Sequence, residues 1–220
     1  MYHSIMQALK KTAANIRFRG SQDYWESRYA KGGTSGSGSY GEFAEFKAEI
    51  INDFLLAHQV NSVIEFGCGD GNQISLMKFP HYIGVDVSPT VMNRCRARFS
   101  GDLTKTFFLS TEYRGQTAEC ALSLDVVYHL TEDRIFTDYM GTLFSSASRF
   151  VILYTSNVMP HELRILNLQM REHVRHRYVT GYVADHYPGW KLAEHIPNRY
   201  PYNWETGKGS FAEFFIYGSR

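Results

Sequence analysis

Apolar and polar positions alternate with two different periods along most of the chain. Five short apolar runs predict buried strands, and they cover residues 62–66, 81–85, 105–109, 119–124 and 149–154. Three stretches between these runs carry apolar side chains at helical spacing, and they cover residues 71–79, 88–98 and 132–146. Strands that alternate with helices indicate an α/β fold, in which a parallel sheet is covered by helices on both faces.

The last part of the chain follows a different pattern. The segments WKLAEHIP (190–197) and SFAEFFIYG (210–218) predict two strands, and no clear helical pattern separates them. Two consecutive strands without a crossover helix favour antiparallel pairing. We therefore expect an antiparallel pair at one edge of the sheet.

The segment before the first strand contains a stretch with the composition of a flexible linker. KGGTSGSGSYG (31–41) stands between two patterned segments, DYWESRY (23–29) and EFAEFKAEIINDFLLAH (42–58). The second segment places an apolar stripe on one helical face, formed by Phe43, Phe46, Ile50, Ile51, Phe54 and Leu55. A linker in this position is typical of a mobile lid. We therefore divide the chain into an N-terminal helix with a lid, residues 1–41, and a main domain, residues 42–220.

The first residues of the chain predict a further helix. Its apolar side chains recur at helical spacing, and they are Tyr2, Ile5, Leu9, Ala13 and Ile16. Basic side chains lie beside or just after them, and they are Lys10, Lys11, Arg17 and Arg19. This pattern fits weak contact with a membrane surface or a partner, and it also fits a helix packed on the domain or on a second subunit.

Composition and charge narrow the class of protein. The chain has 220 residues and a formal net charge of +1 at pH 7, which suits one domain and argues against a protein that coats polyanions. The cysteines Cys68, Cys95 and Cys120 form no CxxC pair, so we expect reduced thiols in a cytoplasmic protein. No apolar run approaches the roughly 20 residues that span a bilayer, and no signal peptide is visible.

The segment VIEFGCGDGN (63–72) combines a strand with three closely spaced glycines. Glycine lets the chain turn tightly and lets a ligand touch the backbone, and the carboxyl end of a strand is where open α/β sheets bind ligands. Dinucleotide-binding proteins need G-x-G-x-x-G, but Asn72 occupies the third glycine position. No Gly-Lys-Ser/Thr follows, which excludes a P-loop. Glu65 would lie near a bound pyrophosphate, and a carboxylate suits an ammonium group better than a phosphate.

A second acidic residue narrows the choice of ligand. Asp86 ends the strand YIGVDVS (82–88), where a carboxylate can accept both ribose hydroxyls of a nucleoside. NAD and S-adenosylmethionine share that requirement. The glycine spacing and Glu65 favour S-adenosylmethionine.

Three motifs in this order resemble those of class I S-adenosylmethionine-dependent methyltransferases. VIEFGCGDG (63–71) is similar to their first motif, YIGVDVS to their second, and CALSLDVVYHL (120–130) to the motif that follows strand four. The resemblance covers residues 63–154 and implies a seven-stranded, mostly parallel Rossmann-like sheet whose last strand is antiparallel. Residues 24–52 also resemble the N-terminal signature of small bacterial methyltransferases often linked to polysaccharide and other small-molecule pathways.

The resemblance implies a cofactor site. Gly67, Cys68 and Gly69 would contact the methionine half, with Glu65 at its amino-acid end. Asp86 would bind the ribose, and Val87 and Ser110 the adenine, although many members carry an acidic residue where Ser110 stands. The lid would cover the cofactor, with Arg28 on its carboxylate. The complete expected set is Tyr24, Arg28, Ser39, Glu65, Gly67, Cys68, Gly69, Asn72, Asp86, Val87, Ser110 and Asp125.

The motif LSLDVVYHLTED (122–133) supplies the candidate catalytic residues Asp125, Tyr128 and His129. Asp125 ends the fourth strand, where the reactive methyl group would lie, and we expect it to orient the cofactor. His129 follows four residues later and is a candidate general base, because the ordinary pKa of histidine, about 6.5, lies near working pH. Tyr128 and Tyr154 are the next candidates for accepting the proton.

Two segments could bind the methyl acceptor. HVRHRYV (173–179) places His173, Arg175 and His176 close together, which fits a clamp for a phosphate, carboxylate or sugar acid and also fits a solvated basic turn. IPNRYPYNW (196–204) combines Arg199 with aromatic residues that suit a sugar or another ring. We expect no metal site, since the histidines lack Cys or acidic partners at ligand spacing.

These patterns predict methyl transfer from S-adenosylmethionine to a small molecule or glycan, at oxygen rather than nitrogen. A nucleic-acid methyltransferase is the first alternative, but the motif [DNS]-P-P-[YFW] is absent after strand four and there is no long basic face. A metal-dependent enzyme is disfavoured, because Asp125 has no acidic or Asn neighbour. A non-catalytic cofactor-binding subunit is the remaining alternative, and methyl transfer by the chain alone would separate the two.

Overall fold

The computed structural model describes residues 20–165 and 173–220. The predicted helix over the first residues, with its expected membrane or dimer contact, lies outside this described part. Among the described residues, no helix is both long enough and apolar enough to cross a membrane.

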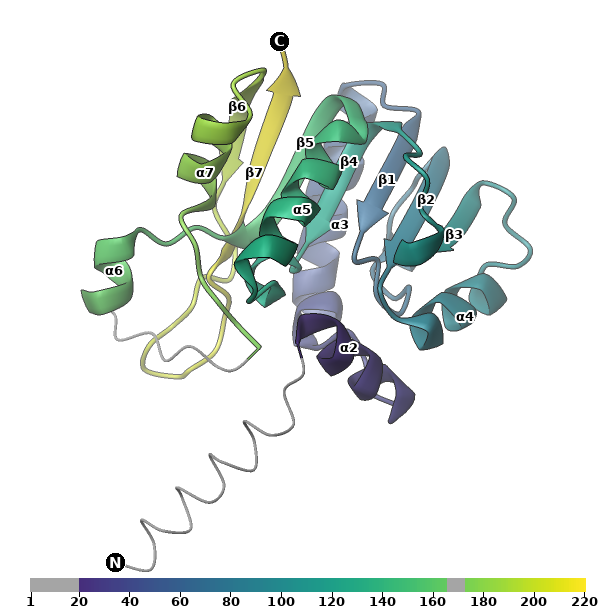
Figure 1. The fold of residues 1–220 in the computed structure, drawn as a ribbon, viewed down its shortest axis with the longest axis horizontal. Coiled ribbons are helices and arrows are strands. Elements are labelled where there is room, and N and C mark those ends of the chain that lie inside the picture. The colour runs from purple at the N-terminus through teal and green to yellow at the C-terminus, as the bar shows by residue number, and fades with distance from the viewer. Residues whose placement is uncertain (1–19, 166–172) are drawn as a thin grey trace, which may run out of the picture.

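Seven strands form one sheet in the order β3-β2-β1-β4-β5-β7-β6 (Figure 1). Their bounds are β1 Ser62–Phe66, β2 His81–Asp86, β3 Lys105–Leu109, β4 Ala118–Leu124, β5 Ala147–Ser156, β6 Trp190–Ile196 and β7 Ala212–Ser219. β7 runs antiparallel to its neighbours β5 and β6, and the pairs among β1 to β5 are parallel. The sheet confirms the predicted fold class, including the antiparallel pair at one edge.

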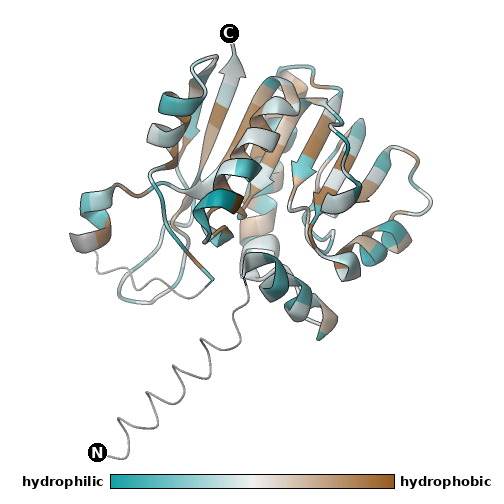
Figure 2. Cartoon of the chain, in the orientation of Figure 1, coloured by the Kyte–Doolittle hydropathy of each residue, from teal (hydrophilic) through white to brown (hydrophobic). Residues whose placement is uncertain are grey.

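Helices cover both faces of the sheet, as the alternating pattern predicted (Figure 2). Neighbouring residues of a strand point to opposite faces, so Val63 of β1 belongs to one core cluster and Ile64 to the other. α3 (Gly41–Ala57) and α4 (Pro89–Arg98) complete the first cluster. α5 (Asp133–Ser145) and α7 (Val179–His186) complete the second cluster.

Two helical segments differ from the sequence predictions. The helix expected over residues 71–79 is wrong, because only the 3-10 turn η2 (Ile74–Leu76) forms there. The side chain of Gln73 donates to the carbonyl of Ala44 at 2.8 Å, and Pro80 disfavours a helical conformation at the residue before it. The short helix α6 (Pro160–Ile165) and α7 were not predicted.

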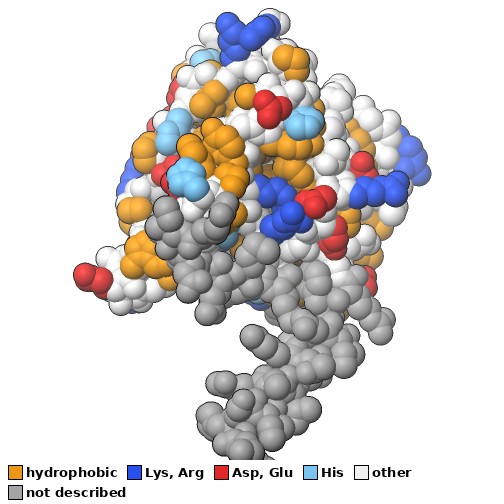
Figure 3. Space-filling view, turned by 60° about the vertical axis from the view of Figure 1, so that its left-hand side comes forward, with side chains coloured by type: hydrophobic (Ala, Val, Ile, Leu, Met, Phe, Trp, Pro, Cys, Tyr) orange, Lys and Arg blue, Asp and Glu red, His pale blue; other side chains and the backbone are white. Residues whose placement is uncertain are grey.

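The surface carries mixed charge. On the face shown in Figure 3, basic and acidic side chains lie next to each other, and hydrophobic side chains and histidines occupy the space between them. Within the described part of the chain, no cluster of three or more His, Cys, Asp or Glu side chains could hold a metal ion. The three cysteines are buried and form no disulfide.

Candidate functional site

The glycine loop after β1 needs glycine for both conformational and steric reasons. Gly67, Gly69 and Gly71 have φ angles of 81°, 61° and 80°, a region that L side chains rarely adopt. A Cβ atom at Gly69 would lie 2.3 Å from Oγ of Ser35, and one at Gly67 would lie 2.4 Å from a methyl group of Val126. The loop therefore forms a bare backbone surface at the carboxyl ends of β1 and β2.

A cavity of about 280 Å³ lies against this loop. The predicted site residues that line it are Ser39, Gly67, Cys68, Gly69, Asp86, Val87, Ser110, Asp125 and His129. Residues from the segment before β1 line it as well, and they include Ser21, Gln22, Trp25, Tyr29 and Ser35. The fold thus brings together residues from the ends of four strands and from the predicted lid. We call this space the first cavity.

Asp86 lies buried at the end of β2 and holds the glycine loop. Its Oδ2 accepts from the backbone N–H of Gly69 and its Oδ1 from that of Ser88, both at 3.0 Å. Burial raises the pKa of Asp86, and these backbone hydrogen bonds oppose the rise. Because a carboxylate oxygen can accept two hydrogen bonds, each oxygen keeps acceptor capacity toward the first cavity.

Glu65 lies deeper than the sequence suggested. Its carboxylate accepts from the hydroxyl of Tyr82 at 2.6 Å, and burial raises its pKa to about 7. Glu65 is absent from the lining of the first cavity. The structure therefore places it beneath the glycine loop, in contact with β2.

The end of β3 places Ser110 in the first cavity and Glu112 outside it. Glu112 accepts from the backbone N–H of Leu109 at 2.8 Å and pairs with Arg96. Glu112, the acidic residue that follows this strand end, is therefore already bonded within the protein.

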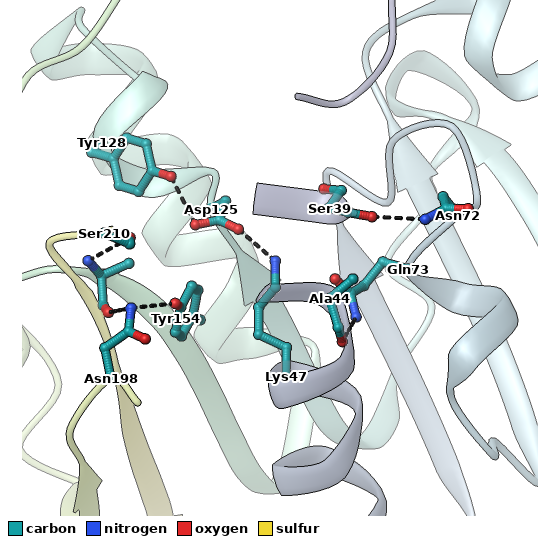
Figure 4. Close-up of polar contacts among 11 residues, drawn as sticks. Ser39, Ala44, Lys47, Asn72, Gln73, Asp125, Tyr128, Tyr154, Asn198 and Ser210 are labelled. Atoms are coloured by element: carbon teal, nitrogen blue, oxygen red, sulfur yellow. Dashed lines mark hydrogen bonds and ion pairs between the residues drawn. The ribbon is translucent and has the colours of Figure 1, made fainter. Parts of the chain in front are cut away.

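The predicted lid is fastened to the glycine loop by side-chain hydrogen bonds. Oδ2 of Asp70 accepts from the backbone N–H of Ser35 at 2.8 Å and from the hydroxyl of Tyr40 at 2.9 Å. The amide of Asn72 donates to the carbonyl of Ser39 at 2.8 Å (Figure 4). Asn72 does not line the first cavity. Its contact holds the short turn η1 (Ser37–Ser39) over the loop.

Two residues predicted to cover the cofactor contact other parts of the protein instead. Arg28, on α2 (Ser21–Ala30), donates to the carbonyl of Thr34 at 2.6 Å and lies 5.8 Å from the ring centre of Trp25. Tyr24 stacks on the ring of His173, with ring centres 4.6 Å apart. Neither Arg28 nor Tyr24 lines the first cavity.

Asp125, at the end of β4, lies at the centre of a buried polar network (Figure 4). Its φ angle is 60°, which turns the chain sharply. Its Oδ1 accepts from the hydroxyl of Tyr128 at 2.7 Å, and its Oδ2 accepts from Nζ of Lys47 at 2.5 Å. Lys47 is fully buried in α3 and was not predicted. The available signal was its position: it falls on the apolar stripe four residues after Phe43.

His129 lies at the edge of the first cavity in a defined tautomer. Its Nδ1 lies 2.8 Å from the carbonyl oxygen of His173. A carbonyl only accepts, so Nδ1 carries the proton and Nε2 keeps a lone pair. Burial lowers the pKa of His129 to about 4, which keeps the imidazole neutral near pH 7.

A second cavity, of about 590 Å³, lies on the other side of Asp125. Its aromatic lining consists of Phe43, Tyr128, Tyr154, Tyr202, Trp204 and Phe211. Its polar lining includes Ser37, Ser156, His176, Ser210 and Asp125. Among the described residues, Asp125 alone lines both cavities.

The basic residues that were predicted to bind an anionic acceptor do not lie together in one cavity. Arg175 pairs with Asp133 at 2.8 Å, and Arg199 pairs with Glu49 through two contacts of 2.7 and 2.9 Å. Neither arginine lines either cavity. Of the expected clamp, His176 alone lines the second cavity, where its Nδ1 lies 2.7 Å from Oγ of Ser156.

Comparison with known proteins agrees with this geometry. A family model described as a methyltransferase domain matches residues 64–150. No curated protein sequence matches the chain significantly.

Several solved structures share the fold. The chain resembles magnesium protoporphyrin IX methyltransferase from Synechocystis PCC 6803, crystallised with SAH, at 17% identity and a TM-score of 0.63, covering 90% of this chain and 98% of that one. It resembles CalS10, an amino pentose methyltransferase from Micromonospora echinaspora, at 14% identity and a TM-score of 0.60. The match covers 82% of this chain and 93% of CalS10. It also resembles the methyltransferase domain of bacterial CtHen1, at 22% identity and a TM-score of 0.58. The match covers 78% of this chain and 97% of that domain.

Proposed function

Because the chain is a class I S-adenosylmethionine-dependent methyltransferase, with its methyltransferase domain over residues 64–150, we propose that it methylates an oxygen of a small-molecule or glycan acceptor. The observation that carries the proposal is the juxtaposition of two cavities at Asp125. One cavity lies against the glycine loop, and the other offers a separate space for an acceptor.

The first cavity fits the cofactor in the chemistry of its lining. The backbone at Gly67 and Gly69 would receive the methionine part, because no side chain stands between it and the cavity. Asp86 would accept the ribose hydroxyls with its remaining lone pairs. Val87 and Ser110 would contact the adenine. When bound, S-adenosylmethionine supplies a methyl group already activated by a sulfonium.

Glu65, Asn72, Tyr24 and Arg28 would act on the cofactor site indirectly. Glu65 would support the strand under the glycine loop through Tyr82. The other three would hold the lid, since their contacts are with Ser39, His173, Trp25 and Thr34. In this proposal, residues 20–41 cover the site and contribute part of its lining, and the remaining lining comes from the domain that follows them.

His129 would accept the proton that the acceptor hydroxyl loses. Its Nε2 keeps a lone pair, and its imidazole is neutral over the working pH range. General base catalysis needs a neutral group within reach of the proton. Asp125 and Tyr128 would orient the reacting groups from the boundary between the cavities.

The neighbours' titles support a small acceptor, because they name a magnesium protoporphyrin and an amino pentose as substrate types of those proteins. The test is made on the purified chain alone. We expect calorimetric binding of S-adenosylhomocysteine and none of NAD, and release of S-adenosylhomocysteine when the chain is given S-adenosylmethionine and an acceptor panel of phenols, sugars and sugar acids. Binding of NAD in place of S-adenosylhomocysteine would remove the proposal. Cofactor binding without methyl transfer to any acceptor would favour a non-catalytic subunit.

A further inference from the structure

The two cavities share one wall. Asp125 belongs to both linings, and the lid loop contributes Ser35 and Ser39 to the first cavity and Ser37 and Gly38 to the second. A Cβ atom at Gly38 would lie 2.9 Å from Oδ2 of Asp125, so the lid backbone passes directly over this carboxylate. Molecules in the two cavities would therefore both contact Asp125.

One part of the second cavity's wall is formed by aromatic rings that pack on one another. Tyr202 stacks on Phe211 with ring centres 4.3 Å apart, and Trp204 lies 5.6 Å from Phe211. These rings belong to the connection between β6 and β7, which is closed by bridges from Pro201 to Ser210 and from Asn203 to Lys208. Trp204 is 57% exposed although it lines the cavity, so part of its ring surface is open to a ligand. Such a surface suits a planar ring, which stacks favourably on aromatic side chains.

The second cavity carries no unbalanced charge among the described residues. The carboxylate of Asp125 is paired with Lys47. Burial lowers the pKa of His176, which favours its neutral form. No lysine or arginine of the described part lines this cavity. An anionic ligand would lose hydration without gaining a cationic partner, and a cationic ligand would find no free carboxylate.

Polar atoms near the shared wall suit a hydroxyl group. Oδ1 and Oδ2 of Asp125 each accept one hydrogen bond within the protein, which leaves acceptor capacity on both. The hydroxyl of Tyr154 accepts from the amide of Asn198 at 2.7 Å (Figure 4) and also bonds to the side chain of Ser210, so its hydrogen-bonding partners lie within the protein. A ligand hydroxyl can donate to Asp125 at the boundary between the cavities, and its proton would pass from there to His129, which lines the first cavity.

From these observations, and resting on the methyltransferase function proposed above, we infer that the second cavity binds the acceptor. We further infer that this acceptor is an uncharged molecule with a planar ring and a hydroxyl group. The ring lies against Tyr202, Trp204 and Phe211, and the hydroxyl group lies at Asp125. This assignment replaces the anionic acceptor that the basic residues of the sequence suggested, because Arg175 and Arg199 are paired elsewhere.

The test compares three probes with the same ring and different charge. 2-Naphthol is neutral, 2-naphthoate is anionic and 2-naphthylmethylamine is cationic near pH 7. Each is titrated into the protein saturated with S-adenosylhomocysteine. We expect 2-naphthol to bind about ten times more tightly than either charged probe, since only the charged probes lose ionic hydration. Tighter binding of the anion or the cation, or no binding of 2-naphthol, would overturn the inference.

A substitution at the rim locates the bound probe. We expect Trp204→Ala to weaken 2-naphthol binding about tenfold, and Trp204→Phe to restore most of the loss. The control is Leu103→Ala, since Leu103 is 98% exposed and lines neither cavity. The affinity for S-adenosylhomocysteine should stay unchanged in all three variants. Unchanged 2-naphthol binding in Trp204→Ala would contradict the inference, whereas failure of the wild-type chain to bind S-adenosylhomocysteine would contradict the proposed function instead.

Discussion

The ammonium group of Lys47 lies 2.5 Å from Oδ2 of Asp125, and it joins α3 to the boundary between the two cavities. The lysine side chain is 1% exposed and the aspartate side chain 15%. Nζ of Lys47 also lies 5.1 Å from the ring centre of Tyr154. The pair fixes the direction of a carboxylate whose backbone already adopts an uncommon conformation. An ion pair this well shielded from water depends on both partners.

We therefore expect Lys47→Met to destabilise the fold by about 3 kcal/mol, because it leaves the carboxylate of Asp125 without its counter-charge. Denaturant unfolding measures this change. The double variant Lys47→Met/Asp125→Asn should regain a large part of the loss, since it removes the stranded charge. Lys191→Met, on an exposed lysine of β6, is the matched control. Additive effects of the two substitutions would contradict coupling between these side chains.

The sequence could not identify this pair, because its two residues are far apart in the chain and the lysine stands among apolar residues. The strands could be predicted, because the pattern that identifies them is local in the sequence. β1 and β4 are buried on both faces, so each carries a continuous apolar run that local reasoning can detect.

Two further sequence predictions failed for the same reason that Lys47 was missed, because the contacts that decide them join residues far apart in the chain. The helix predicted after the glycine loop fails because the side chains of Asn72 and Gln73 bond to Ser39 and Ala44, on the lid and on α3. The basic residues predicted to grip an anion are paired with acidic residues that only folding brings near. The glycine loop and Asp86, which line the first cavity, could be singled out from the sequence because they lie in short, ordered motifs.

Asp86 should matter more for the cofactor than for the fold. We expect Asp86→Asn to lower the affinity for S-adenosylhomocysteine by about two orders of magnitude, because charge-assisted hydrogen bonds to the ribose are weakened. Calorimetry measures the affinity, and thermal unfolding without ligand checks the fold. Asp86→Ala should also lower stability, since Gly69 and Ser88 then lose their acceptor. Asp185→Asn, on an exposed residue of α7, serves as the control. Wild-type affinity in Asp86→Asn would refute the ribose assignment.

We expect the rate of proteolysis in the lid to depend on bound cofactor and on the side chain of Asp70. Trypsin can cut after Lys31, which is exposed at the end of α2. We expect S-adenosylhomocysteine to slow this cleavage markedly, because it would fill the cavity that Trp25, Ser35 and Ser39 line. Asp70→Ala should speed the cleavage about tenfold, since the lid then loses the bonds from Ser35 and Tyr40.

Cleavage after Lys208 gives an internal reference for this experiment, because that residue is exposed and lies in the connection between β6 and β7. Equal rates after Lys31 with and without S-adenosylhomocysteine would show a plain linker instead of a lid.

The pH dependence of His129 gives a further test with a definite sign. The pKa of His129 in the folded protein is about 4, below the ordinary value of about 6.5, and the first cause is burial. Between these pH values the unfolded chain binds more protons than the folded one. The contribution of His129 to the free energy of unfolding is therefore greatest above pH 6.5. It decreases as the pH falls toward 4, by up to about 1.4 kcal/mol per pH unit. Unfolding experiments at pH 5 and pH 7 should show this difference, and His129→Gln should reduce it.

The same shift determines the rate profile if His129 is the base. Only neutral imidazole accepts a proton, and a pKa of about 4 leaves it mostly neutral at pH 5. With an acceptor from the panel above, kcat should therefore stay nearly level from pH 5 to pH 8, without a rise centred at 6.5. His129→Ala should lower kcat by roughly 10²–10⁴ and leave the affinity for S-adenosylhomocysteine unchanged. A fully active His129→Ala would exclude His129 as the base. Burial raises the pKa of Tyr128 and of Tyr154 well above the ordinary range of tyrosine, which keeps both hydroxyls protonated and disfavours them as proton acceptors, so the proton would then leave to solvent.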